Sequence, residues 1–434
     1  MISQLDIAAH VSRCDPQRLS PAERVFLKTL LLDYLGCTIA GARSDAAARL
    51  RGAMMNRETG PAHVVGARTR APAPVAAFLN AYACHVMDFD DVHGKAIYHP
   101  GAPTISAIRA VAERDEIDTA RFVAGVVAGY EAGIRLGEAA GKEHYRRHHT
   151  TGTVGCVGAA AGAALALGLD PAGVSSAMGF AATQAAALWA YRDDGSDAKP
   201  VHAGHAAMVG VLSADLARAG LQGPRFSLEG PNGFLRTLGG DVGSSTETAQ
   251  GPWRFTSTSL KPYACCGHTH SGLAAAARVL AELGEEGLRS GPLPTIRIET
   301  YAAAIEIAGI QSPETIEHAR FSYSYLVSHF LVHGGLENAF AQAGLSDPRV
   351  AALARRIEIV RNEQMDLLYP DKQPVRLTLM TDDGREWCFE VMHSLGSPEN
   401  PMPEALHRSK LEGLAGCDIG SLHDQVADLV GHDF

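Results

Sequence analysis

Residues 152–169 read GTVGCVGAAAGAALALGL, and this segment is the main indication of the architecture. Alanine and glycine dominate it, so it falls short of the roughly 18–20 strongly apolar residues that a membrane span requires. Small side chains let helix backbones approach closely, because the distance between helix axes depends on the residues at the contact. We therefore expect closely packed helices in a bundle-like core. Similar stretches lie at residues 73–87, 101–114, 119–140 and 175–190.

Working outward, residues 1 to about 255 are predicted to be mostly helical. Ser20-Pro21-Ala22-Glu23 is typical of a helix start, with a serine cap, proline at the first position and glutamate at the third. Residues 24–40 continue it with apolar residues at helical spacing. The one exception is residues 63–66, for which a strand or an extended loop is expected.

The pattern changes near residue 255. Apolar and polar residues alternate at 294–301, 356–361, 375–381 and 386–391, as in half-buried strands. Asp382-Asp383-Gly384 predicts a hairpin turn between the last two. Helical stretches are expected at 270–283 and 325–340, and again from residue 401.

The 434 residues exceed the roughly 250–300 at which single cores usually stop growing, so we expect two domains. The fold class predicted is mostly α with an α+β second domain. The first domain is all-helical, spans residues 1–258 and is completed by a C-terminal tail, 393–434. The second is a smaller α+β domain, 259–392.

Composition excludes several classes of protein. With 46% hydrophobic and 20% charged residues, the chain is not disordered. A net charge of −10 argues against nucleic-acid and membrane partners, although a local basic pocket for a small anion remains compatible. No signal peptide is recognised at the N-terminus, so a cytoplasmic location is expected. The eight cysteines form no CxxC pair, so reduced thiols are expected, and only the adjacent pair Cys265–Cys266 stands out.

Four polar segments carry the residues that suggest chemistry, at 87–101, 143–155, 195–205 and 259–270. The first holds three carboxylates and two histidines, which can move protons near neutral pH; a capped helix end with solvated acids is the alternative. The second is a basic, histidine-rich loop leading into a helix, an arrangement that favours an anion over a metal or a dinucleotide. The third encloses Lys199 between small residues, where it can hold a carboxylate or lie in an ordinary turn. The fourth places a lysine, two thiols and two histidines at the domain junction, where a Cys–His nucleophile and a zinc site stay open.

Taken in order, these four segments resemble the MmgE/PrpD family. The resemblance continues through LDYLGC at 32–37, EGPNGF at 229–234, FSYSY at 321–325, DGR at 383–385 and PENPM at 398–402, and so covers nearly the whole chain. It implies a helical domain closed by the C-terminal tail, a smaller α+β lid domain and a homodimer. It also implies a small polycarboxylate as substrate, with proton movement beside a carboxylate and no organic cofactor. No metal is expected, because the histidine and cysteine spacings are not those of a usual metal site. The activities known in the family are 2-methylcitrate dehydratase, cis-aconitate decarboxylase and iminodisuccinate epimerase.

Carried over by motif, the resemblance assigns proton transfer to His149 and Asp88 and a shared role to His99. Lys199 and Lys261 are expected to bind carboxylates, with His202 and His268 beside them in the same motifs. Tyr325 is expected to enter from the lid domain as an acid or base. The full predicted set is catalytic Asp88, His99, His149, Tyr325 and Cys266, and substrate-binding Lys199, Lys261, His202 and His268.

Two positions depart from the family pattern. Val92 stands where dehydratase and decarboxylase members tend to have threonine, and Cys266 stands where the decarboxylase has a histidine. Cys266 is therefore either an alternative proton carrier or a neutral thiol lining the pocket. A lyase, either a dehydratase or a decarboxylase, is the leading expectation. An epimerase is the close alternative, and an inactive carboxylate-binding relative and a metal-dependent hydrolase stay open behind it.

Overall fold

The computed structural model describes residues 3–55, 59–239, 251–284, 288–416 and 419–431. The chain forms two compact units. The first, called the helical unit here, comprises residues 1–191, 197–260 and 403–434. The second, called the mixed unit, comprises residues 192–196 and 261–402.

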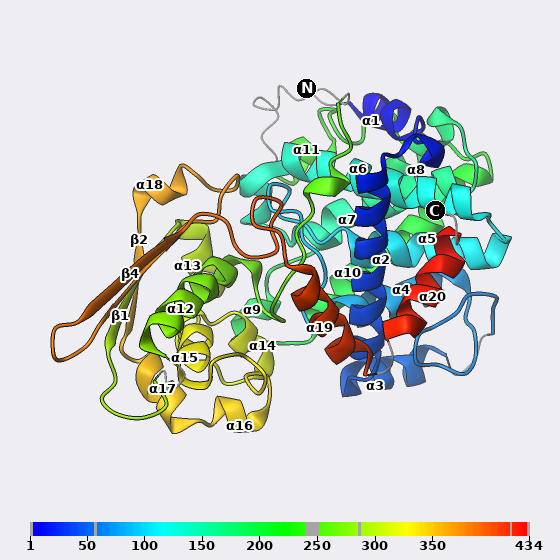
Figure 1. Cartoon of the computed structure of the whole chain (residues 1–434). Helices are drawn as coiled ribbons and strands as arrows, with labels where there is room; N and C mark the ends of the chain where they lie inside the picture. Colours follow the sequence, from blue (N-terminus) through cyan, green and yellow to red (C-terminus); the bar gives the residue numbers. More distant parts are fainter. Residues whose placement is uncertain (1–2, 56–58, 240–250, 285–287, 417–418, 432–434) are drawn as a thin grey trace. The chain divides into compact units, whose positions relative to one another are not determined.

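The helical unit is built around α7, Thr150–Ala166 (Figure 1). This helix packs against α5, α6, α8 and α10, and nearly all its residues are buried. The segment that the sequence marks as a closely packed helix is therefore the centre of the core. The helices of this unit are α1 Gln4–Val11, α2 Pro21–Ala42, α3 Asp45–Met54, α4 Ala73–His85, α5 Gly101–Asp115, α6 Thr119–Tyr145, α7, α8 Pro171–Ala182, α10 Ala198–Arg218, α11 Phe234–Thr237, α19 Glu404–Ala415 and α20 Ile419–Val430; α9, Tyr191–Asp194, crosses between the units.

Glycines set the distance between α6 and α7. A Cβ atom on Gly158 would lie 2.8 Å from the carbonyl oxygen of Gly129, and one on Gly162 would lie 2.6 Å from that of Gly125. No side chain fits at such distances, so the two helices touch backbone to backbone. The close packing expected from the small residues is confirmed here.

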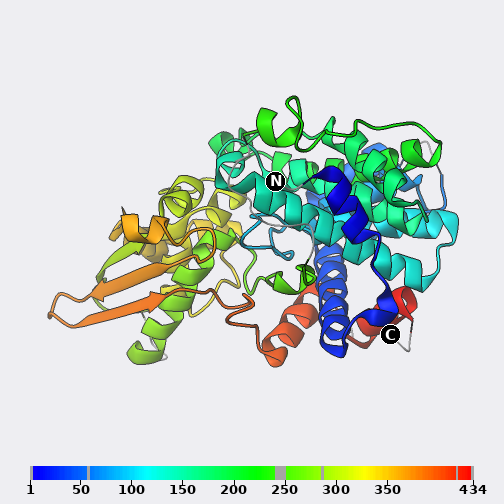
Figure 2. The same ribbon diagram turned by 90° about the horizontal axis from the view of Figure 1, so that it is seen from above.

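The C-terminal tail completes the helical unit. Its helices α19 and α20 pack against α2, which lies beside them in both views (Figures 1 and 2). The start of α2 has the expected capping box: Ser20 caps the backbone of Glu23, and the Glu23 carboxylate accepts from the Ser20 N–H at 2.7 Å. Within the helical unit, the tail begins at Pro403.

Among the residues that the structure describes, one helix meets the length and composition criteria for crossing a membrane. It is α2, not the 152–169 segment that appears most apolar in the sequence. Of the window that meets the criteria, 67% is buried inside the structure. These surroundings are those of a core helix, and the feature is weak evidence for a membrane span.

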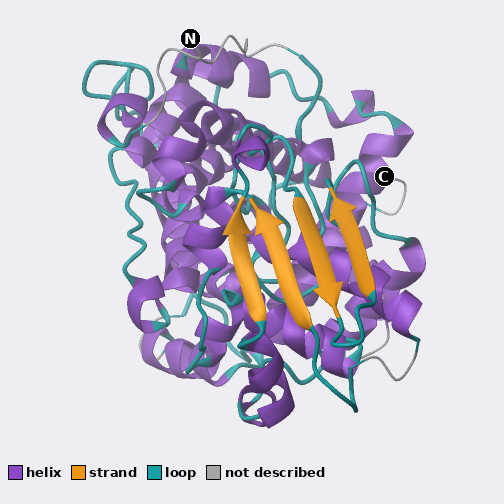
Figure 3. Cartoon of the chain, turned by 90° about the vertical axis from the view of Figure 1, so that its left-hand side faces the viewer, coloured by secondary structure: helices purple, strands orange, loops and turns teal. Residues whose placement is uncertain are grey.

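The mixed unit contains a four-stranded sheet in the order β2-β1-β3-β4 (Figure 3). β1 pairs with β2 in parallel and with β3 antiparallel, and β3 and β4 form an antiparallel hairpin across the expected turn, with Gly384 at φ +85°. Alternate residues of β1 and β3 are buried, as the sequence alternation predicts, and α12 packs on β3 and β4. The elements are α12 His270–Leu283, β1 Thr295–Thr300, α13 Ala302–Ala308, α14 Ile316–Arg320, α15 Tyr323–His333, α16 Gln342–Leu345, α17 Pro348–Ala354, β2 Ile357–Arg361, α18 Glu363–Asp366, β3 Val375–Met380 and β4 Glu386–Val391.

The predicted fold class, a helical domain plus an α+β domain, is confirmed, but two helix ends are wrong. The helix expected at 175–190 ends at Ala182, and the chain then turns so that the Trp189 indole donates to the carbonyl of Tyr145 at 2.6 Å. The helix expected at 325–340 ends at His333, because Gly334 adopts φ +81° and caps it. Residues 63–66 are a loop, beside an isolated bridge between Ala62 and Ala71.

All seven cysteines among the described residues are free, as expected. Cys265 and Cys266 are buried neighbours that precede a short 3-10 turn, Gly267–Thr269. Cys417 lies outside the described residues.

Candidate active site

The loop between α4 and α5 carries most of the polar residues of the site. It leaves α4 at His85 and reaches α5 at Gly101. Asp88 adopts φ +52°, in the left-handed region that non-glycine residues rarely occupy. Such backbone strain persists only where the surroundings hold it, and it is common at functional sites. Asp88 and Asp90 both contact His99.

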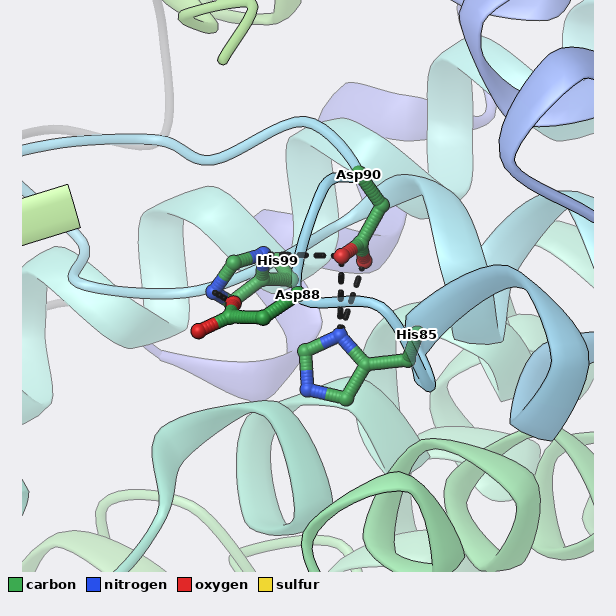
Figure 4. A group of neighbouring side chains, drawn as sticks. All are labelled: His85, Asp88, Asp90 and His99. Atoms are coloured by element: carbon green, nitrogen blue, oxygen red, sulfur yellow. Dashed lines mark hydrogen bonds and ion pairs between the residues drawn. The ribbon is translucent and has the colours of Figure 1, made fainter. Parts of the chain in front are cut away.

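Asp90 is the centre of this cluster (Figure 4). Both of its oxygens lie 2.9 Å from Nδ1 of His85, and its Oδ1 lies 3.5 Å from Nδ1 of His99. Nε2 of His99 lies 3.8 Å from Oδ1 of Asp88. The His99 ring therefore stands between two buried carboxylates.

Lys199 supplies the positive charge of the cluster. It lies in the first turn of α10, and its Nζ is 2.8 Å from Oδ2 of Asp88. Its side chain is 8% exposed and that of Asp88 is 3% exposed. Burying two charges is costly unless they are paired, so this contact accounts for both.

Two more histidines extend the site from neighbouring helices. His149 is the residue directly before α7, and its Nδ1 lies 3.1 Å from Nδ1 of His202 on α10. The His149 ring stacks on that of His85, with centroids 5.6 Å apart and planes at 19°. Trp189 and Tyr191 contact His149 from the other elements of the same unit.

Burial determines the protonation of these histidines. Burial lowers the pKa of His85 to about 4, although Asp90 opposes the shift. Burial, together with His85 and Lys199, holds the pKa of His149 well below its ordinary value, and burial lowers that of His202 to about 4. At neutral pH these three rings are uncharged and able to accept protons, beside the ionised pair Lys199–Asp88. For Asp90, burial would raise the pKa, but His85 and His99 lower it well below the usual range.

Asp91 anchors the loop instead of facing the cluster. Its Oδ1 accepts from the N–H of Gly101 at 3.0 Å, and its Oδ2 accepts from the Tyr130 hydroxyl at 2.7 Å. A Cβ on Gly101 would lie 2.6 Å from that Oδ1, so the contact requires glycine. Burial, with a further contribution from Asp90, raises the pKa of Asp91 to about 8. The carboxyl thereby holds the start of α5, two residues beyond His99, in place.

The same cluster has the donor set of a metal site. Ligand atoms of His85, Asp88, Asp90 and His99 lie within 4.8 Å of one another. A divalent cation there would face the ammonium group of Lys199, whose charge opposes it. Each carboxylate already has a histidine or lysine partner, so the arrangement is better suited to moving protons than to binding an ion.

The predicted site residues divide between the two units. Five of the nine come together in the helical unit: Asp88, His99, His149, Lys199 and His202. The other four, Lys261, Cys266, His268 and Tyr325, belong to the mixed unit and are all buried there.

Three of these four residues, Cys266, His268 and Tyr325, have partners within the mixed unit. His268 Nδ1 lies 2.7 Å from the Tyr301 hydroxyl. The backbone N–H of Cys266 donates to the carbonyl of Arg320 at 3.0 Å. Tyr325 donates its hydroxyl proton to the carbonyl of Ala339 at 2.6 Å, and burial raises its pKa. The roles assigned to these four residues stay predictions.

Sequence reasoning missed His85 and did not assign a role to Asp90. The run from Met87 onward draws attention to its carboxylates, whereas His85 lies at the end of an otherwise apolar helix. A histidine that closes an apolar helix just before an acidic run was the available signal.

Comparison with known proteins gives a consistent result over both units. Residues 5–247 match the MmgE/PrpD N-terminal domain, and residues 263–430 match the MmgE/PrpD C-terminal domain. A cis-aconitate decarboxylase of Aspergillus terreus is 28% identical over 417 residues, which is 90% of this chain and 84% of that protein. A cis-aconitate decarboxylase of Homo sapiens is 29% identical over 302 residues, 67% of this chain and 62% of the human protein. The family expected from the motifs is thus confirmed by matches that span nearly the whole chain, and the chain belongs to the MmgE/PrpD family.

Proposed function

We propose that this protein is a lyase acting on a small polycarboxylate, with proton transfer at a carbon beside a carboxylate. The observation that carries the proposal is the ionised pair Lys199–Asp88, held among uncharged, buried histidines. The similarity to cis-aconitate decarboxylases supports both the reaction class and the substrate class.

The pair Lys199–Asp88 is proposed to bind one carboxylate of the substrate. An ammonium group next to a buried carboxylate can shift toward an incoming anion, so the substrate arrives at a site that already holds the cation. Lys261 is expected to bind a carboxylate in the same way, as the family resemblance implies.

The histidines are proposed to carry the proton. A base must be unprotonated before it can act, and the low pKa of His149 keeps it so at neutral pH. His99 stands between two carboxylates, so it is the ring best placed to act as the acid. These groups supply an acid, a base and an anion clamp, and the proposed reaction requires no organic cofactor.

Epimerisation of a dicarboxylate such as iminodisuccinate is the second candidate. It is favoured by Val92, which replaces the hydroxyl expected in dehydratase and decarboxylase members, and by histidines on several elements that can serve both faces of a carbon. The outcomes differ in the bonds that break. Dehydration and epimerisation begin with removal of the C–H proton, followed by loss of hydroxide or by return of a proton to the opposite face. Decarboxylation breaks the C–CO₂ bond, and the carbanion that this leaves takes up a proton from an acid.

The test is a product assay with purified protein. 2-Methylcitrate, citrate, cis-aconitate and iminodisuccinate are incubated separately, and products are identified by proton NMR. An alkene product or released carbon dioxide supports the lyase, and inverted stereochemistry without loss of mass supports the epimerase. Saturable binding without conversion of any of the four would instead favour a carboxylate-binding relative that lacks catalysis.

A further inference from the structure

His85 occupies a position that the family motifs leave without a role. It is the last residue of α4, and its side chain is fully buried. Its Nδ1 is 2.9 Å from both oxygens of Asp90. A carboxylate partner on Nδ1 fixes the proton on that nitrogen and leaves a lone pair on Nε2.

The Nε2 atom of His85 is buried and has no hydrogen-bond partner among the described residues. Figure 4 shows it on the side of the ring away from Asp90. A buried polar atom without a partner loses its contact with water and gains no hydrogen bond in return, so native structures rarely keep one without a reason. An atom of a bound substrate would provide the missing partner.

The surroundings of His85 are those of the proposed reaction. Its ring stacks on His149 and meets His99 edge-on, with centroids 4.7 Å apart for the second pair. Lys199 is close enough to contribute to lowering its pKa. The His85 ring therefore lies in contact with the groups that are assigned to substrate binding and proton transfer.

Two other buried histidines show what a structural role looks like. His144 uses both nitrogens, one 2.9 Å from the carbonyl of Leu238 and the other 2.8 Å from the Thr153 hydroxyl. His93 also has an unpartnered Nε2, but its Nδ1 accepts from the N–H of Ala96, so its proton is on Nε2 and the atom cannot serve as a base. Of these three, His85 alone combines an orienting carboxylate with an open lone pair.

We propose that His85, oriented by Asp90, is a catalytic base of this enzyme, acting at the carbon beside a substrate carboxylate. This inference rests on the proposed function and adds His85 to His149 as a second ring that can receive the proton. Asp90 is a positioning residue, because it acts through the imidazole.

The step balances as a simple proton transfer. The lone pair of His85 Nε2 takes the proton, the C–H bond breaks, and its electron pair enters the carboxylate to form an enediolate that faces Lys199. In a dehydration, the imidazolium returns the proton to the departing hydroxide to give water. In an epimerisation, a proton returns to the opposite face of the carbon from another acid, and His85 is restored by solvent.

The experiment compares His85→Gln, Asp90→Asn and the control His144→Gln, using the substrate that the wild type converts. We expect His85→Gln to lose at least about 100-fold in kcat with KM changed less than about threefold, the range typical of a lost general base. Asp90→Asn should also lower kcat with little change in KM, but by a smaller factor. The amide still occupies the position of the carboxylate but no longer stabilises the imidazolium. His144→Gln should keep kcat within about threefold of the wild type, even if its thermal midpoint falls.

Added imidazole should restore part of the activity of His85→Ala and none of that of His144→Ala. A folded His85→Gln protein with wild-type kcat overturns the inference and leaves the proposed function intact. If His85→Gln does not fold, Asp90→Asn decides, since an unchanged kcat there also overturns it. A wild type that converts no substrate of the panel contradicts the proposed function itself.

Discussion

Two buried lysine–aspartate pairs in the helical unit have opposite surroundings. Lys410 lies 2.5 Å from Asp33, donates to the carbonyl of Phe89 at 2.9 Å, and stands 4.2 Å above the Phe89 ring. Lys199 lies 2.8 Å from Asp88, in a loop with strained backbone and uncharged histidines around it. The first pair joins the C-terminal tail to α2 and to the loop of the site, so both charges are committed to the fold. The second pair lies beside groups that can take up or give protons. A site that binds an anionic substrate and moves a proton on it requires both a cation and such groups.

The largest effect is expected from the histidines that distinguish the second pair. His149→Asn should lower turnover by about 10²–10⁴-fold if the ring is an acid or base of the reaction. Initial rates at saturating substrate measure it. A near-wild-type rate would move that role to another ring of the cluster and weaken the comparison.

The first pair is tested by stability. Lys410→Met leaves Asp33 buried without its cation, so the free energy of unfolding should fall by about 3–5 kcal/mol. Urea unfolding followed by circular dichroism gives the value. The double variant Lys410→Met/Asp33→Leu should recover much of the loss, because it removes both charges. A single variant as stable as the wild type would show that this pair does not hold the fold.

The second pair is tested by binding. Lys199→Met should weaken substrate binding by about 2–5 kcal/mol, while costing less stability than Lys410→Met, because nearby histidines can be protonated to compensate Asp88. Isothermal titration calorimetry measures binding, and the urea experiment measures stability. Unchanged affinity would contradict the proposal that Lys199 binds a carboxylate of the substrate. Lys261→Ala tests the other predicted lysine separately, and we expect a loss of affinity of similar size.

The pH dependence of the free energy of unfolding distinguishes the buried histidines from the pair Lys410–Asp33. Burial lowers the pKa of His85, His144 and His202 to about 4, whereas an unfolded histidine titrates near 6.5. The unfolded chain therefore binds more protons between these values, and the free energy of unfolding should fall as the pH drops from about 6.5 to 4.

The pair Lys410–Asp33 should not contribute to that slope. The pKa of Asp33 is lowered, because Lys410 and His407 outweigh the effect of burial, and its stabilisation is lost only below the ordinary carboxylate range near 4. His202→Gln should therefore make the difference in unfolding free energy between pH 7 and pH 5 smaller. Equal pH slopes for this variant and the wild type would contradict the assignment of a neutral buried ring.

The smallest effect is expected from removing metal. Lys199 opposes a cation at the cluster of His85, Asp88, Asp90 and His99, so dialysis against EDTA should change kcat less than about twofold. Activity assays before and after dialysis check this. A loss that zinc or manganese restores would make the cluster a metal site and support the hydrolase alternative.

Much of the fold is predictable because its signals are local. The capping box at Ser20, the alternation in β1 and β3 and the small residues of α7 each specify an element within one segment. One wrong helix end depended on a contact that no segment shows alone, the hydrogen bond between Trp189 and the carbonyl of Tyr145. The other lay at Gly334, a local C-cap residue that the predicted helix 325–340 ran past.

The site was less predictable because its pairings depend on the tertiary structure. Motifs indicated Asp88, His99, His149 and Lys199, but two of the pairings cross elements: Lys199 on α10 contacts Asp88 in the α4–α5 loop, and His149 at the start of α7 contacts His202 on α10. The contact between His85 and Asp90 spans the left-handed residue Asp88, and the contact between Asp33 and Lys410 joins residues 377 positions apart. Local patterns do not encode such contacts.

The central claim is that the cluster around Lys199 and Asp88 moves a proton at a carbon beside a carboxylate. Proton NMR in D₂O, with the four polycarboxylates and with wild type, Lys199→Met and Lys410→Met, tests it most directly. We predict that deuterium enters that carbon with the wild type, much less with Lys199→Met, and still with Lys410→Met at a temperature where it is folded. No incorporation by the wild type from any of the four, or equal incorporation by Lys199→Met, would contradict the claim.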